Sequence, residues 1–144
     1  MHFHPTPTLT PHLHVDLDGS AAAADARHAA RSFLAPSAHG QPAVPPVALD
    51  ATLLVISELV TNAVRHTAGG CALDLQVRPD GVDVDVTDTS NADPRPRPPD
   101  RRGEGGWGWH LVNRLGTDVE IRHHAVRGGK TIHVHVPHAS PRAG

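Results

Sequence analysis

Three polar residues recur four positions apart within an apolar stretch of the chain: Glu58, Asn62 and His66. In an α-helix, such positions differ by about 40° around the axis, so the three side chains share one face. An asparagine carbonyl oxygen can bind Mg²⁺, and a glutamate can accept a proton from water or a hydroxyl group. The row is therefore compatible with metal and phosphate chemistry, although an ordinary solvated helix face has the same pattern.

Two other segments contain residues suited to a nucleotide. Asp88 follows the alternating run from Val82 to Thr87, and a carboxylate at a strand end can accept a hydrogen bond from the amino group of a base such as adenine. The Gly-rich run from Gly103 to Gly108 leads into a helix-like segment, and such runs let backbone N–H groups approach phosphates. Each signal is weak alone, because Asx turns and glycine-rich loops are common.

Two helices are expected in the first half of the chain. The Ala-rich segment from Ala21 to Ala35 favours a helix that Pro36 ends. A second helix, from about Val47 to Thr67, has an apolar stripe at helical spacing, formed by Leu49, Leu53, Ile56, Val60 and Val64. The row of Glu58, Asn62 and His66 lies on a different face of this second helix.

Alternating segments and turn signals predict five strands. The expected elements are a strand over His12–Leu17, a hairpin of Cys71–Val77 and Val82–Thr87, a loop over Asn91–Gly106, a short helix over Trp107–Leu115, and a hairpin of Asp118–His123 and Lys130–Val136. Because the strands pair as hairpins, this order favours an α+β fold. We expect a two-layer α/β sandwich, with a mixed, mostly antiparallel sheet covered on one face by helices.

Length and composition exclude several classes of protein. The 144 residues suffice for one domain, which we place at residues 12–137, between a flexible N-terminal segment (1–11) and a C-terminal tail (138–144). A formal net charge of −2 gives no basic surface for nucleic acid or membranes. The single Cys71 excludes an internal disulfide framework, and no apolar run approaches the roughly 20 residues of a membrane span. We therefore expect a soluble, cytoplasmic protein.

Taken in order, these motifs resemble the histidine-kinase-like ATPase domain (GHKL or Bergerat fold) of histidine kinases, type II topoisomerases and heat-shock chaperones. Within it they are most similar to the stand-alone anti-sigma-factor serine/threonine kinases and their actinobacterial relatives. The run from Glu58 to His66, ELVTNAVRH, matches the pattern E-L-V-x-N-A-x-x-H. Gly103 to Val112 resembles G-x-G-x-G-x-x-L-V, and Gly129-Lys130-Thr131 precedes a strand that ends at Pro137. The resemblance covers roughly Ala21 to Pro137.

The resemblance implies a binding site for ATP and Mg²⁺. Asn62 would bind the Mg²⁺ that bridges the phosphates, Glu58 would be the general base, and Asp88 would bind the adenine amino group. The other implied site residues are Gly106 and Gly108 at the phosphate-facing loop and helix start, Gly103 and Gly105 in the lid hinge, Arg65 and His66 near phosphate or lid, and Thr131 on the adenine side.

The resemblance further implies a regulator that transfers the γ-phosphate of ATP to a serine of an anti-anti-sigma-type protein. A sigma factor is a second implied partner, and a homodimer is possible. The sequence departs from the family at one place, because Thr89-Ser90-Asn91 follows Asp88 where the family pattern D-x-G-x-G has two glycines. This departure favours an alternative, a catalytically silent protein-binding module of the same fold, whereas the intact Glu58 and Asn62 favour the kinase.

The histidines suggest a third, weaker hypothesis. His12 and His14, like His133 and His135, are two positions apart on expected strands, so each pair shares a face and is able to hold a transition metal. No third ligand is indicated by the sequence. We therefore expect these histidines to face solvent rather than to form a metal site.

Overall fold

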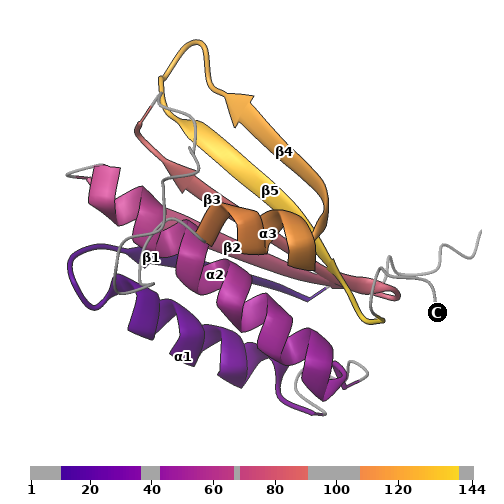
Figure 1. Cartoon of the computed structure of the whole chain (residues 1–144). Coiled ribbons are helices and arrows are strands. Elements are labelled where there is room, and N and C mark those ends of the chain that lie inside the picture. The colour runs from indigo at the N-terminus through magenta and orange to yellow at the C-terminus, as the bar shows by residue number, and fades with distance from the viewer. Residues whose placement is uncertain (1–10, 37–42, 67–68, 91–107, 140–144) are drawn as a thin grey trace, which may run out of the picture.

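A five-stranded sheet forms one layer of the domain, and helices form the other (Figure 1). The computed structural model describes residues 11–36, 43–66, 69–90 and 108–139. The elements are β1 (His12–Leu17), α1 (Ala22–Leu34), α2 (Pro46–His66), β2 (Cys71–Arg78), β3 (Gly81–Asp88), α3 (Gly108–Leu115), β4 (Thr117–His123) and β5 (Lys130–Pro137). The loop expected over 91–106 lies outside the described residues, as do most of the N-terminal segment 1–11 and of the tail 138–144.

The sheet has the strand order β1-β2-β3-β5-β4. Every neighbouring pair of described strands is antiparallel, so the predicted α+β sandwich with a mostly antiparallel sheet is confirmed. Both predicted hairpins are present, with Arg78 opposite Gly81 and His123 opposite Lys130 at the turns. The two hairpins meet at β3 and β5, which lie beside each other although more than forty residues separate their registered partners, such as Asp88 and Lys130.

Side chains on successive strand residues point to opposite faces, and only one face is covered by the described helices (Figure 1). The valines Val82, Val84 and Val86 of β3 are buried beneath the helices, while Asp83 and Asp85 between them are only half-buried. The same alternation runs along β2 and β5. Burial of one face therefore fixes the register, because a slip of one residue would turn the valines toward solvent.

Helix α2 packs on the sheet and also contacts α1 and α3. Its buried surface includes the predicted Leu53, Ile56 and Val60 and is wider than the expected stripe, with Val55, Leu59 and Ala63 also buried and Leu49 and Val64 only partly so. Over Pro46–Arg65 this helix is long and apolar enough to cross a membrane, so the expectation that no apolar run approaches that length is wrong. Its contacts with α1, α3 and the sheet are those of the central helix of a globular core.

Two leucines of α2 allow a matched test of this packing. Leu59 is 1% exposed and Leu54 is 47% exposed. Leu59→Ala is expected to lower the free energy of unfolding by about 2–5 kcal/mol, because it removes buried methyl groups and leaves a cavity. Leu54→Ala is expected to change it by only about 0.5 kcal/mol. Urea unfolding measures both values, and equal losses would contradict the assignment of α2 faces.

Candidate functional site

The first part of the candidate site lies where α2 meets the start of α3. Glu58 is half-buried on α2, and its carboxylate lies against Gly108, the first residue of α3, so closely that a side chain at Gly108 would collide with Oε2. A Cβ atom at Gly108 would therefore require the end of the Glu58 side chain to move, so the absence of a side chain at Gly108 lets the carboxylate lie against α3. The structure thus brings together the two most specific motifs of the sequence, which are fifty residues apart in the chain.

Asn62 follows Glu58 by one helical turn and is also half-buried, on the same side of α2. Arg65, near the C-terminal end of the helix, is exposed. His66 is the last residue of α2, and its side chain lies outside the described part of the structure. Gly103, Gly105 and Gly106 also lie outside it, so Gly108 alone represents the Gly-rich run in the described geometry.

Asp88 is the last residue of β3 and is buried in an ion pair with Lys130. Lys130 Nζ donates hydrogen bonds to both carboxylate oxygens at 3.0 Å, and the backbone N–H of Ser90 donates to Oδ1 at 2.8 Å. The ammonium group also lies 3.4 Å from the Ser90 carbonyl oxygen. Lys130 is not among the site residues expected from the sequence.

Strand alternation, together with the β3–β5 pairing, explains this ion pair. Asp88 continues the inward-facing set of Val82, Val84 and Val86, and Lys130 begins the inward-facing set of β5 that continues with Ile132. Asp88 and Lys130 are direct partners in the strand register. Because the inward positions of both strands were recognisable from their apolar residues, the pairing of their charged ends follows once β3 and β5 are known to be neighbours.

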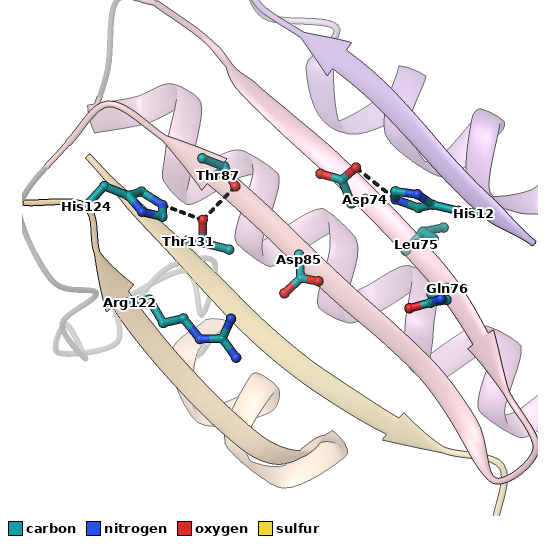
Figure 2. A pocket seen from close by; sticks show the side chains of 9 residues that line it. All are labelled: His12, Asp74, Leu75, Gln76, Asp85, Thr87, Arg122, His124 and Thr131. Atoms are coloured by element: carbon teal, nitrogen blue, oxygen red, sulfur yellow. Dashed lines mark hydrogen bonds and ion pairs between the residues drawn. The ribbon is translucent and has the colours of Figure 1, made fainter. Parts of the chain in front are cut away.

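Thr131 has the opposite orientation and is not brought together with Asp88. Its hydroxyl group lies on the open face of the sheet, where Oγ1 is hydrogen-bonded to Thr87 Oγ1 and to His124 Nε2, both at 2.8 Å (Figure 2). A residue adjacent to an inward-facing lysine on a strand must face outward. The residue of this segment that faces Asp88 is therefore Lys130, and Thr131 belongs to a separate polar group.

The turn before β5 holds Lys130 in place. Gly129 has a φ of +84°, and a Cβ atom there would collide with the Asp88 carbonyl oxygen and lie 3.0 Å from Thr89 Cα. Only glycine combines this backbone conformation with so close an approach. The turn is closed by hydrogen bonds from the His124 N–H to the Gly129 carbonyl oxygen (2.9 Å) and from the Gly128 N–H to the His124 carbonyl oxygen (2.8 Å).

Cys71 lies opposite Asp88 on the other neighbouring strand, β2. Burial, followed by repulsion from the Asp88 charge, raises the pKa of the Cys71 thiol to about 11. The thiol is therefore protonated at neutral pH and is not a nucleophile. Cys71, Asp88 and Lys130 together form a buried end of the sheet next to the loop that follows β3.

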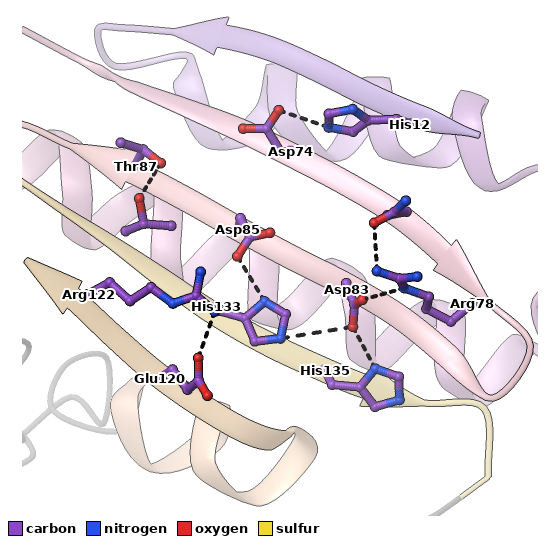
Figure 3. A network of polar contacts seen from close by, with 12 residues as sticks. His12, Asp74, Arg78, Asp83, Asp85, Thr87, Glu120, Arg122, His133 and His135 are labelled. Atoms are coloured by element: carbon purple, nitrogen blue, oxygen red, sulfur yellow. Dashed lines mark hydrogen bonds and ion pairs between the residues drawn. The ribbon is translucent and has the colours of Figure 1, made fainter. Parts of the chain in front are cut away.

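The face of the sheet that the described helices leave open carries a second group of titratable residues (Figure 3). Four histidines are hydrogen-bonded to aspartates of neighbouring strands: His12 and His14 to Asp74 (3.0 and 2.7 Å), His133 to Asp85 (2.8 Å) and His135 to Asp83 (2.7 Å). Within the described ranges, no three His, Cys, Asp or Glu side chains are arranged to hold a metal ion. A hollow of about 330 Å³ lies on this face, between residues such as Asp74, Asp85 and Arg122 (Figure 2).

Asp83 has the largest number of charged partners on the open face. Arg78 Nε donates to it at 2.8 Å, and His133 Nε2 lies at 4.0 Å, in addition to the bond with His135. Burial is the largest single influence and acts to raise the pKa of Asp83. The hydrogen bonds from Arg78 and His135, with the charges of His135 and His133, together outweigh it, so the pKa lies below its ordinary value of 3.8.

Comparison with known proteins identifies this arrangement. The arrangement is a sheet with its helices on one face, and a central helix that presents Glu58 to the start of the short helix α3. The model of the histidine kinase-like ATPase domain family matches residues 20–135, and the chain belongs to this family. Comparison with curated protein sequences gives no match.

A solved structure with the same fold contains the RsbU and RsbW domains of Rv1364c from Mycobacterium tuberculosis. The match has a TM-score of 0.61 and 23% sequence identity, and it covers 93% of this chain. It covers 35% of the other chain, so this protein spans about a third of that neighbour's length. The likeness shows that the two proteins share a fold.

The pKa of Asp83 leads to a prediction on stability. Asp83→Asn is expected to lower the free energy of unfolding by about 1–2 kcal/mol near neutral pH, because Arg78 and the histidines lose a charged acceptor. The pKa of Asp83 is lower in the folded state than the unfolded-state value of 3.8. Its contribution to the free energy of unfolding is therefore complete above pH 3.8, and it is lost as the pH falls through the folded-state pKa. The difference between wild type and variant is therefore expected to shrink at acid pH.

Urea unfolding of both proteins at about pH 7 and about pH 3 measures this difference. Asp16→Asn serves as the control, because Asp16 is the most exposed aspartate of the histidine–aspartate pairs on this face, at 85% side-chain exposure. It is expected to have little effect at either pH. A difference for Asp83→Asn that stayed constant or widened in acid would show that its ionisation does not stabilise the fold.

Proposed function

We propose that the protein is an ATP-binding regulator that transfers the γ-phosphate of ATP to a serine of an anti-anti-sigma-type partner protein. The observation that carries the proposal is the contact between Glu58 and Gly108 at the start of α3. It joins a carboxylate able to accept a proton to the end of the Gly-rich run, where backbone N–H groups favour phosphate. Membership of an ATPase-domain family supports ATP as the ligand.

In the proposed site, Asn62 and Glu58 lie one turn apart on α2 and offer only oxygen ligands, the kind that Mg²⁺ prefers. Mg²⁺ is usually held by one or two protein ligands together with substrate phosphates, so Asn62 is sufficient as its protein ligand. When bound, the ion would neutralise phosphate charge. Arg65 and His66, at the end of the helix, are proposed to lie near phosphate or lid, and Gly103, Gly105 and Gly106 are proposed to complete the phosphate-binding loop.

Glu58 is proposed to act as the general base in the transfer. Its carboxylate accepts the proton of the serine hydroxyl, whose oxygen forms a bond to the γ-phosphorus as the bond to the ADP oxygen breaks. The half-buried carboxylate already lies beside the start of α3, and a base that is oriented before the reaction avoids the cost of orienting it during the transfer. The same proposal includes the protein partner, which is a sigma factor or an anti-anti-sigma-type protein. It also includes a cytoplasmic location and a homodimeric state.

Mg²⁺-dependent ATP binding, measured by calorimetry, tests the nucleotide site. Asn62→Ala is expected to weaken binding at least tenfold, which is about 1.4 kcal/mol, because it removes the proposed Mg²⁺ ligand. Thr61→Ala is the matched control, since Thr61 is the half-buried neighbour on α2 that faces about 100° away. It is expected to bind ATP as wild type does.

The same experiment distinguishes the alternative function. If wild type does not bind ATP in the presence of Mg²⁺, the proposed kinase is wrong, and a catalytically silent protein-binding module of the same fold takes its place. The buried Asp88–Lys130 pair favours this module, because the carboxylate proposed for the adenine amino group already has a partner.

A further inference from the structure

We infer that Lys130 determines the base specificity of the proposed nucleotide site: its ammonium group takes the position of a base amino group at Asp88, so the site does not select adenine by that group. The inference rests on the proposed function, since it concerns the base end of the same site. Lys130 belongs to the motif Gly129-Lys130-Thr131, in which the resemblance assigned a site role only to Thr131.

The hydrogen bonds of the pair leave little room for a further donor. A carboxylate offers about four acceptor positions, and Asp88 uses three of them, two for Lys130 Nζ and one for the Ser90 N–H. Lys130 in turn has three donors, directed at the two Asp88 oxygens and the Ser90 carbonyl oxygen. The two side chains are 3% and 2% exposed, so water does not compete for these bonds.

A base amino group is a weak competitor for this carboxylate. The Lys130 ammonium carries a positive charge that attracts the Asp88 carboxylate, whereas a base amino group is a neutral donor without that Coulomb attraction. Displacement of the ammonium would also leave a buried positive charge without a partner, which is strongly unfavourable. An adenine that entered the site would therefore leave the Asp88–Lys130 pair in place, and its amino group would add little to binding.

The backbone fixes the point beside Asp88 from which the Lys130 side chain extends. Lys130 is the register partner of Asp88, and the preceding Gly129 is packed against the Asp88 carbonyl oxygen, where no Cβ atom fits. The turn hydrogen bonds between His124, Gly128 and Gly129 fix the start of β5. The lysine is thus held by its strand and its turn as well as by its charge.

The test compares two nucleotides on the wild-type protein. Calorimetry with Mg²⁺ gives dissociation constants for ATP and for purine riboside triphosphate, which has hydrogen in place of the amino group. We expect the two constants to agree within about threefold. A preference for ATP of tenfold or more would overturn the inference while leaving the proposed ATP site intact.

Lys130→Met provides the second arm. It frees the Asp88 carboxylate, and the folded variant is expected to prefer ATP over purine riboside triphosphate at least tenfold. Arg122→Met is the matched control, because it removes an exposed positive charge from the neighbouring strand β4, on the open face, and its nucleotide ratio should equal that of wild type. A folded Lys130→Met protein that bound both nucleotides equally would overturn the inference.

The remaining outcomes separate the inference from the proposed function. If only Lys130→Met binds ATP, and it prefers ATP over purine riboside triphosphate at least tenfold, Lys130 occupies the amino-group position at Asp88 as inferred, and the natural chain is not the proposed kinase. If Lys130→Met does not fold, as judged by circular dichroism, the wild-type ratio decides alone. If no folded protein of the set binds either nucleotide, both the inference and the proposed site are wrong.

Discussion

The burial of one sheet face against α2 is the interaction on which the rest of the structure depends. It places Val82, Val84 and Val86 in the core and turns the aspartates between them outward. The same alternation carries Asp88 and Lys130 inward at the strand ends, where they have no water to solvate them and must satisfy each other. The alternation of side chains along the strands thus accounts both for the packing of the core and for the buried pair of Asp88 and Lys130.

Helix α2 serves the core and the site with different faces. Leu59 and Val60 are buried, while Glu58 and Asn62 lie at the half-buried boundary, where Glu58 meets α3. A polar side chain at such a boundary is held by its packed neighbours and remains near solvent and ligand. A rigid helix that is fixed by a large apolar contact is therefore a suitable carrier for a base and a metal ligand.

Aspartates of the sheet have different roles because their environments differ. On the open face, Asp74, Asp83 and Asp85 pair with partly exposed histidines, and Asp83 also pairs with Arg78. Solvent screens these charges, and the lowered pKa of Asp83 makes its contribution to stability depend on pH. At the buried end, Asp88 pairs with the only lysine of the chain. Either charge would be costly to bury without the other, so the two side chains are expected to stay paired when a ligand binds.

The sequence by itself determined the elements, their order and the family, because periodicity, turn residues and the motif from Glu58 to His66 are local signals. It also indicated that Glu58 and Asn62 share a helix face. The tertiary structure alone decided that β3 and β5 are neighbours, and hence that Lys130 rather than Thr131 faces Asp88. Strand order joins residues more than forty positions apart, and this follows from how the hairpins pack under α2, which no local pattern encodes.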